Sequence, residues 1–479
     1  MLLSTKKDDN VQRVLKKLSS DDVVTLDMPV GDNLATLIFI DPVTNKEWLG
    51  NLALKPLKAF VGKGDFNDVK SALGSGEIKE CTTVEEITEQ IILGNPALII
   101  EDCNKALTFG AKLIETRAIS EPPTSTVLKG PRTGFTENII ASLNLMRQRI
   151  KSEKMKFKYF KVGKYSQTLV VVTYVEGITP KELIKQITDR IKLIDTDAIL
   201  DSSYIAQHLT KRKASIFKQY GTTEKPDVLV SKILEGRVGI LVEGSPIALT
   251  LPYVMLEDFQ SPADYYTLNY RAVFSRLIRL IAVGIAVLLP SFYVAAELFH
   301  IQLIPLKFLL TIVNGIKGIP LSPSIEMFFT LLIFEILFEA SVRMPKHAGM
   351  VISIVGGLVL GETAVSAGII SAPTLMIMAL SGICLFTAPE LQETFSIIRL
   401  IYLLVAGALG GYALVLLTVG LVIYLVDFEN FKTPILAPYA PLIESDLKDG
   451  FFKDFNLSNN TRPKLLRSKN RTRQIIKDR

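Results

Sequence analysis

The stretch LIRLIAVGIAVLLPSFYVAAELF (277–299) decides how this chain is organised. A predominantly apolar run of about 20 residues can cross a bilayer as a helix, because each helical residue rises about 1.5 Å and the hydrocarbon core is about 30 Å thick. Arg276 and Arg279 at its start are expected to act as cytoplasmic anchors. The sequence therefore predicts a change at this point from a soluble region to a membrane domain.

Further apolar segments follow this one. Three of them are expected to span: Ile325 to Val342, Ala348 to Ile370 and the shorter Thr374 to Ala388. Ser396 to Val426 is longer and has Gly410-Gly411 at its centre, so it forms either one long, tilted helix or two passes broken at the glycines. Ile301 to Ile319 is apolar but interrupted by Pro, Lys and Gly, which is typical of a segment that enters a membrane only where protein or water covers its backbone.

These segments predict a transmembrane domain over residues 271–430 with four to six helices. Residues 431–479 are predicted to form a basic cytoplasmic tail, since Arg462 to Arg479 contains eight Lys or Arg and one Asp, and positive charge is retained on the cytoplasmic side. Both ends in the cytoplasm require an even number of passes. Nucleic-acid binding by the tail is the alternative, and we expect membrane lipid rather than nucleic acid as its partner because juxtamembrane basic clusters are common.

Other features of the composition limit which kinds of site and activity are expected. The first fifteen residues are charged and have no apolar run, so no cleaved signal peptide is expected. Cys81, Cys103 and Cys384 show no CxxC spacing, and the chain has three histidines, which argues against a disulfide framework and a metal site. No Ser-His-Asp or Cys-His arrangement is evident. We therefore predict no enzyme activity, no cofactor and no metal.

The region before residue 271 is predicted to be α/β. Short β-branched runs predict buried strands, and apolar stripes at helical spacing lie between them. The predicted strands are Thr36 to Ile40, Ala97 to Glu101, Leu169 to Val175 and Arg237 to Glu243. Thr179 to Glu182 is interpreted as a capping box with Pro180 at the first helical position. Gly110 to Lys129 is predicted to join two subdomains, 1–120 and 121–270, and the charged stretch 151–161 is predicted to be a solvated loop beside an edge strand.

One turn in this region has two interpretations. Gly130, Pro131, Arg132 and Gly134 precede a predicted helix, where a glycine turn and an arginine could hold an anion. The pattern matches no P-loop or dinucleotide fingerprint. The alternative is a turn that locks two elements together or contacts another subunit. Arg147 and Arg149, at the end of the same helix, are explained by its dipole.

Carboxylates within apolar segments are the main candidates for function, because each is costly unless it is paired or hydrated. Glu335, Glu339 and Arg343 share one helical face, and Glu339 is well oriented to pair with Arg343. Glu326 is expected at the opposite rim. Glu362 follows Gly356, Gly357 and Gly361, small residues that allow close helix packing. Glu335, Glu339 and Glu362 are predicted either to line an ion path or to form ion pairs and interfacial contacts.

Several longer strings make the sequence specific to one family. They include KGPRTGFTENIIASLNLMRQRI (129–150), TEKPDVLVSKILEGRVGILVEGSP (223–246), QSPADYY (260–266), VRMPKHAGMVISIVGGLVLGETAVSAGIISAP (342–373) and SIIRLIYL (396–403). Together, and in this order, they resemble the A subunit of the GerA-type spore germinant receptors of endospore-forming bacteria. The similarity runs from about Thr36 into the last apolar segment.

The resemblance implies a two-part cytoplasmic N-terminal region followed by a membrane domain in the inner membrane of the spore. It also implies two partners, a transporter-like, B-type permease subunit that binds the germinant and a C-type lipoprotein subunit. A subunits of this family are thought to form a homo-oligomer that conducts cations. A secondary transporter is a second hypothesis, because broken or glycine-rich segments can surround a midplane site. A sporulation paralogue outside the tripartite receptors is a third.

Overall fold

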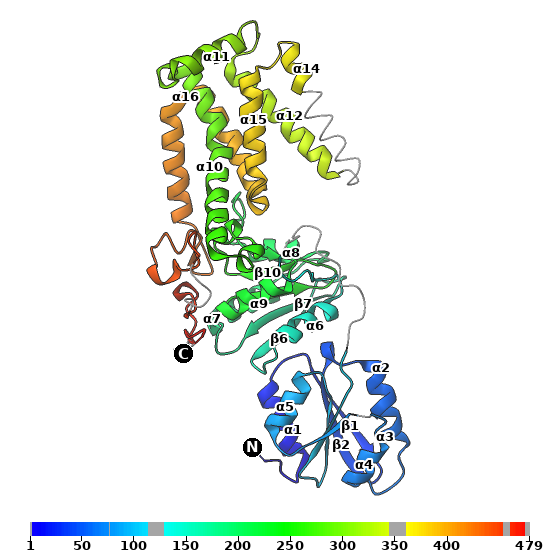
Figure 1. Ribbon diagram of the computed structural model, residues 1–479. Helices are drawn as coiled ribbons and strands as arrows, with labels where there is room; N and C mark the ends of the chain where they lie inside the picture. The colour runs from blue at the N-terminus through cyan, green and yellow to red at the C-terminus, as the bar shows by residue number, and fades with distance from the viewer. Residues whose placement is uncertain (1, 76, 114–128, 344–360, 454–459, 475–479) are drawn as a thin grey trace.

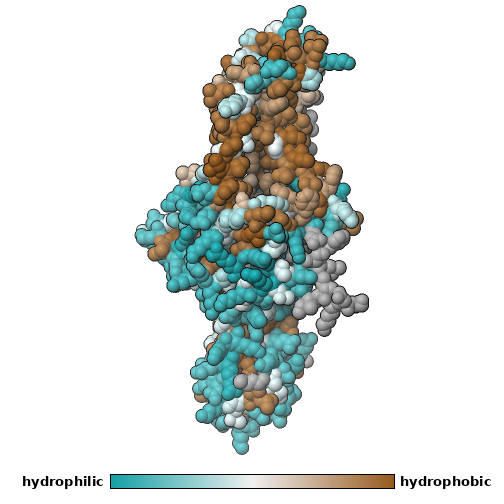
Figure 2. All heavy atoms as spheres, turned by 90° about the vertical axis from the view of Figure 1, so that its left-hand side faces the viewer, coloured by the Kyte–Doolittle hydropathy of each residue, from teal (hydrophilic) through white to brown (hydrophobic). Residues whose placement is uncertain are grey.

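Three parts follow one another along the long axis of the molecule (Figure 1). The computed structural model describes residues 2–75, 77–113, 129–343, 361–453 and 460–474. An N-terminal α/β domain lies at one end, a second α/β domain lies in the middle, and a helical bundle forms the other end. On the face shown in Figure 2, hydrophobic residues cover most of the bundle and hydrophilic residues cover most of the two α/β domains.

The first domain is a five-stranded antiparallel sheet covered on both faces. Its strand order is β1-β2-β4-β5-β3, with bounds Val23–Val30, Asn33–Ile40, Ala97–Ile100, Ala106–Phe109 and Ile78–Cys81. Helices α1 (Lys7–Leu18) and α5 (Val84–Ile92) pack on one face. The other face is covered by α2 (Lys46–Leu49), a π-helical turn (Gly50–Leu54), α3 (Lys55–Ala59) and α4 (Phe66–Ala72). Along β2, Leu37 and Phe39 pack on the face covered by α2, α3 and α4, whereas Ile38 and Ile40 pack on the face covered by α1 and α5. The side chains alternate because successive strand residues point to opposite faces of a sheet.

The second domain repeats the same topology. Its strands β6, β7, β9, β10 and β8 span Met155–Val162, Thr168–Val175, Val238–Val242, Ala248–Leu251 and Gly221–Thr223, and they are again antiparallel. Helices α6 (Ile139–Arg149) and α9 (Pro226–Glu235) cover one face, and α7 (Lys181–Lys192) and α8 (Ser202–Leu209) cover the other. If the strands of each domain are numbered from its own first strand, both sheets have the order 1-2-4-5-3. The two domains are therefore a structural repeat.

Two local predictions in this domain were wrong. The Thr179 hydroxyl donates to the carbonyl of Arg237 and does not cap α7, whose N-cap is Pro180 without a side-chain hydrogen bond. The charged stretch 151–161 is not a loop throughout, because β6 begins at Met155 and forms the edge strand itself. Lys156 on this strand is buried and donates to the carbonyl of Lys17 in the first domain. Lys156 therefore contacts the first domain, although its charge had indicated exposure to solvent.

The bundle contains α10 (Asn269–Phe299), α11 (Leu306–Ile316), α12 (Pro323–Arg343), α14 (Gly361–Ser366), α15 (Ala372–Leu385) and α16 (Gln392–Val426). Within the described part of the chain, α10 and the stretch Pro389–Val426 are long and apolar enough to cross a membrane. Helix α12 covers the residues of the predicted span Ile325 to Val342 but is not one of these two candidates, and Ala348 to Ile370 lies mostly outside the described residues. The number of passes remains a prediction.

Helix α16 is a hairpin of two arms, 392–409 and 411–426. At Gly410 the backbone leaves the helical region, with φ 72° and ψ −165°. The hydroxyl of Tyr402 donates to that of Thr418 over 3.1 Å, whereas residues sixteen positions apart in a straight helix are about 24 Å apart. Of the two interpretations of residues 396–426, the one with a break at the glycines is therefore confirmed.

The C-terminal segment lies against the second domain (Figure 1). Phe431 joins the core beneath α7, and the Ser468 hydroxyl donates to the carbonyl of Ile178 over 2.7 Å. The Nε of Arg462, the first of the basic residues, donates to the carbonyl of Leu234 over 2.7 Å. Part of the predicted tail is thus a structural component of this domain.

Candidate functional site

A buried chain of polar groups connects four elements of the bundle. Arg399 on the first arm of α16 is 4% exposed, and its Nη2 donates to Oε1 of Glu335 on α12 over 2.6 Å. Its Nη1 donates to the hydroxyl of Ser381 on α15 over 3.0 Å, and Ser381 donates to the carbonyl of Ala286 on α10 over 2.6 Å. An arginine buried this deeply in an apolar bundle needs such partners. The chain fixes the packing of α10, α12, α15 and α16.

Arg399 was missed as a site residue, although the sequence contained a signal for it. It is the sole charged residue between Ser396 and Val426, in the string SIIRLIYL. An ionisable residue in an apolar span is a candidate for function by default. The partner of Glu335 comes from a distant helix, and sequence spacing alone could not identify it.

The other predicted residues of α12 lie in different environments. Glu339 and Arg343 form the i, i+4 ion pair that their spacing predicted, with 2.6 Å between Oε1 and Nη2, and both side chains are exposed. Glu335 turns to Arg399 instead of joining them. Glu326 was expected at the rim, but it is 1% exposed, and its Oε1 accepts from both the backbone N–H and the hydroxyl of Ser371 at 2.7 Å.

Glu362 lies on α14, at the end of the bundle remote from the α/β domains (Figure 1). Its side chain is exposed. Gly361 packs closely on α15, because a Cβ at this position would lie 3.2 Å from Cδ2 of Leu375. Gly356 and Gly357 lie outside the described residues. The structure therefore does not bring Glu362 together with Glu335, which is half-buried and paired with Arg399 in another part of the bundle.

The turn at Gly130 lies against the segment that leads into α10. Gly130 has φ +119°, and a Cβ would lie 2.6 Å from the ring of Tyr266, so this position needs glycine. The hydroxyl of Tyr266 donates to Oδ2 of Asp227 on α9 over 2.7 Å. Pro131 is half-buried, Arg132 is exposed and Gly134 is buried. The turn thus packs on the connection between the second domain and the bundle, which suits coupling of these two parts.

Arg147 has a partner that the helix-dipole explanation did not include. Its Nε and Nη2 donate to the two carboxylate oxygens of Asp22 over 2.9 and 2.8 Å, and both side chains are buried. The guanidinium also lies 4.7 Å from the ring centroid of Phe157. Asp22 precedes β1 and Arg147 is on α6, so this ion pair joins the two α/β domains.

Residues 211–218 of the second domain connect to both ends of the α16 hairpin. Lys218 Nζ donates to Oε2 of Glu390, just before the first arm, over 2.5 Å. Arg212 Nη2 donates to Oδ2 of Asp427, just after the second arm, over 2.6 Å. Lys218 also lies 4.0 Å from the buried carboxylate of Asp258, whose burial raises its pKa to about 7. These ion pairs join the second domain to the two segments that flank α16.

The arginines at the start of α10 are bound by protein carboxylates. Arg279 makes a bidentate contact with Asp264, at 2.8 and 2.9 Å. Arg276 is fully buried and donates to Asp449 Oδ1 of the C-terminal segment over 3.0 Å. They therefore anchor α10 to the second domain and the C-terminal segment.

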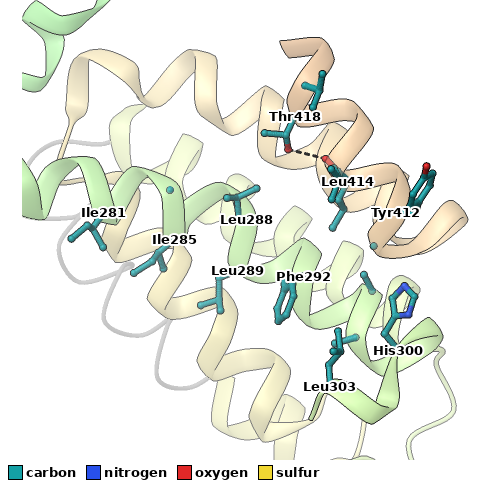
Figure 3. Close-up of a pocket in the computed structure, with 16 residues that line it drawn as sticks. Ile281, Ile285, Leu288, Leu289, Phe292, His300, Leu303, Tyr412, Leu414 and Thr418 are labelled. Atoms are coloured by element: carbon teal, nitrogen blue, oxygen red, sulfur yellow. Dashed lines mark hydrogen bonds between the residues drawn. The ribbon is translucent and has the colours of Figure 1, made fainter. Parts of the chain in front are cut away.

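An apolar groove of about 880 Å³ runs between α10 and the second arm of α16 (Figure 3). Ile281, Leu288 and Phe292 line one side, and Tyr412 and Leu414 line the other. The Thr418 hydroxyl donates to the carbonyl of Leu414, so its polar group is satisfied within its own helix. This groove suits an apolar occupant.

Comparisons with known proteins identify chains of similar sequence. A family model described as Bacillus/Clostridium GerA spore germination protein matches residues 9–465. Spore germination protein KA of Bacillus subtilis (strain 168) is 30% identical over 99% of this chain and 89% of its own length. Spore germination protein GerLA of Bacillus cereus is 34% identical over 91% and 90%, respectively. The uncharacterized membrane protein YfkQ of B. subtilis is 32% identical over 90% and 85%.

One solved structure is also similar. The crystal structure of the N-terminal domain of the A subunit of the Bacillus megaterium spore germinant receptor GerK3 matches with a TM-score of 0.39 and 24% identity. The match covers 52% of this chain and 96% of that chain.

Two repeated α/β domains, joined by buried ion pairs to an apolar helical bundle, define a multidomain protein with a candidate membrane part. The chain belongs to the Bacillus/Clostridium GerA family of spore germination proteins. Its function accordingly lies in spore germination, as the resemblance implied.

Proposed function

We propose that this chain is the A-type subunit of a nutrient germinant receptor in the inner membrane of the spore, with both α/β domains in the cytoplasm. Copies of its bundle assemble into a gated path for monovalent cations, beside a B-type permease-like subunit and a C-type lipoprotein subunit. The family match and the names of the relatives support the receptor role.

The observation that carries the gating proposal is the double connection of residues 211–218 to α16. Because Lys218 and Arg212 bind opposite ends of one hairpin, a change in the spacing of its arms changes both contacts. Germinant binding to a partner would then shift a closed–open equilibrium through different contacts in the two states. The four-element chain through Arg399 supplies a bundle rigid enough to move as a unit.

The experiment is potassium release from spores exposed to a panel of amino acids, sugars and nucleosides. Spores that lack this chain should fail to release potassium to at least one nutrient that triggers wild-type spores, and the wild-type gene should restore release. Normal release to every nutrient that triggers wild-type spores would contradict the receptor role and favour the sporulation paralogue. Nutrient uptake by the purified chain in vesicles without cation conduction would favour the secondary transporter.

Two substitutions examine the predicted ion path at Glu362. Glu362→Gln should alter the kinetics of cation release at normal abundance if this carboxylate holds or selects cations. Gly361→Leu should instead lower abundance, because the side chain would clash with Leu375. Immunoblots of the inner membrane separate the two effects, and unchanged kinetics for Glu362→Gln would assign Glu362 an interfacial role.

A further inference from the structure

A second polar cluster lies in the bundle, apart from the Arg399 chain. Both carboxylate oxygens of Glu297, on α10, are buried and have no hydrogen-bond partner among the described residues. One turn earlier on the same helix, Tyr293 is 5% exposed, and its buried hydroxyl likewise completes no hydrogen bond. A buried carboxylate and a buried phenol that are both unsatisfied are unusual, since nearly all buried polar groups have partners.

Two other elements bring oxygens to the same place. The Tyr293 hydroxyl lies close to Glu297 and to Thr374 of α15, and Glu326 of α12 acts on it through its charge. Ser371 connects these two elements, because its hydroxyl donates to Oε1 of Glu326 over 2.7 Å and lies 2.9 Å from the Thr374 hydroxyl. Glu297 also interacts with Glu326. Apolar residues surround the cluster, including Val294, Met327 and Met378. The cluster therefore presents carboxylate, phenol and hydroxyl oxygens from three helices in an apolar environment.

The two carboxylates have different roles. Oε1 of Glu326 accepts two hydrogen bonds from Ser371, the N-cap of α15, so this carboxylate sits at the positive end of a helix and is stabilised as an anion. Among the described residues, no backbone N–H or helix end stabilises Glu297 in this way. In the described ranges, no Lys, Arg or His forms an ion pair with either carboxylate. Two neighbouring carboxylates in an apolar bundle both stay ionised only with a positive charge between them; without it, one of them holds a proton.

We propose that Glu297, Tyr293, Glu326 and Thr374 form a binding site for one monovalent alkali cation. Carboxylate, phenol and hydroxyl oxygens are hard ligands, which suit Na⁺ or K⁺. One cation neutralises the charge of Glu297, while the positive N-terminal end of α15 stabilises the negative charge of Glu326. The site goes beyond the proposed function, because a cation bound here stabilises the junction of α10, α12 and α15 whether or not the bundle conducts.

The test uses the full-length chain, purified in detergent, with thermal unfolding followed at constant ionic strength. Replacing choline chloride with NaCl or KCl should raise the Tm of the wild type, because a ligand that binds only the folded state stabilises it. Glu297→Gln should weaken the apparent cation affinity at least about tenfold. The matched control is Glu393→Gln, which removes an exposed carboxylate in the first turn of α16 and should keep the wild-type response.

Tyr293→Phe removes only one oxygen and should weaken the response less than Glu297→Gln, so it keeps the test decisive if that variant does not fold. Equilibrium dialysis of the wild type with ²²Na⁺ or ⁸⁶Rb⁺ should give about one bound ion per chain. An identical response in Glu297→Gln would overturn the proposal. So would a Tm that depends on pH but not on alkali cations, which would assign a proton to Glu297, or a response to Mg²⁺ or Ca²⁺ alone.

Discussion

Arg399 Nη2 and Glu335 Oε1 lie 2.6 Å apart, which ties the first arm of α16 to α12 inside the bundle. Arg399→Met should destabilise the protein, because it leaves Glu335 without its counter-charge. Breaking a buried pair costs about 3–5 kcal/mol, and since Glu335 is 35% exposed we expect about 2–3 kcal/mol. Thermal unfolding of the full-length chain in detergent measures this effect.

The control for Arg399 is Arg343→Met. Arg343 and Glu339 form an exposed pair of the same chemistry, for which about 0.3–0.5 kcal/mol is expected. Equal losses in the two variants would contradict the structural role of the buried pair. Adding Glu335→Leu to Arg399→Met should recover part of the lost stability, because it removes the unpaired carboxylate.

The Asp22–Arg147 ion pair is expected to stabilise the contact between the two α/β domains. Arg147→Met leaves Asp22 buried without its partner and should cost about 3–5 kcal/mol. Limited proteolysis should then cleave between the domains at lower protease concentrations than in the wild type. Lys46→Met, which removes an exposed pair with Asp41, should leave the cleavage pattern unchanged.

Asp258 predicts a pH dependence of stability. Its folded-state pKa of about 7 exceeds the ordinary value of 3.8, so between about pH 4 and 7 the folded state keeps a proton that the unfolded chain has lost. Stability should therefore fall as the pH rises through this window and level off above pH 7. Asp258→Asn should flatten this dependence and exceed the wild type at pH 8 by roughly 2–4 kcal/mol, from 1.36 kcal/mol per pKa unit.

Asp427→Asn is the matched control for this pH profile. It removes a carboxylate from the same junction, but one that is exposed beside Arg212. Its unfolding profile should keep the wild-type slope between pH 4 and 7. A slope that persists in Asp258→Asn would assign the dependence to another group.

Gly410 should tolerate no side chain. Its φ of 72° and ψ of −165° fall in a region open almost only to glycine, and a Cβ would lie 2.8 Å from Cγ of Phe299. Gly410→Ala should lower the free energy of unfolding by about 1–3 kcal/mol. Gly420→Ala, in the second arm with open space around its Cα, should be neutral or stabilising by about 0.5–1 kcal/mol.

The hairpin also predicts a covalent link. Cysteines introduced together as Tyr402→Cys and Thr418→Cys should be cross-linked by a bismaleimide, because the native side chains meet with their hydroxyls 3.1 Å apart and the reagent spans the gap left by the tyrosine ring. A continuous helix would hold them about 24 Å apart and prevent the reaction. Tyr402→Cys paired with Val426→Cys, far along the second arm, is the negative control. Failure of the first pair to react would contradict the hairpin.

Local sequence patterns predicted two interior strands in each sheet. The β-branched runs at residues 36–40, 97–101, 169–175 and 237–243 correspond to β2, β4, β7 and β9, which lie inside their sheets. The edge strand β6 was missed because its alternating lysines are typical of exposed chain. The repeat of one topology in both domains was missed as well, because strand order depends on long-range pairing that no single segment contains.

The site was predictable only in part for the same reason. The i, i+4 pair Glu339–Arg343 follows from helix geometry and was confirmed. The partners of Glu335, Glu326 and Arg147 come from segments distant in sequence, and the sequence analysis identified none of them. Glu297 was overlooked because a single carboxylate near the end of an apolar run looks like an interfacial residue.

The contacts of residues 211–218 have a mechanical consequence. Arg212 binds Asp427 and Lys218 binds Glu390, the residues at the two ends of the α16 hairpin. Six peptide units separate Arg212 from Lys218, a distance of about 20 Å when the chain is fully extended. The same segment continues directly into β8, the edge strand that pairs with β10. A rotation of one arm against the other must therefore be absorbed as tension in this short tether or passed on as shear between β8 and β10. The pairing of β8 with β10 would then change when the two arms of α16 move relative to each other.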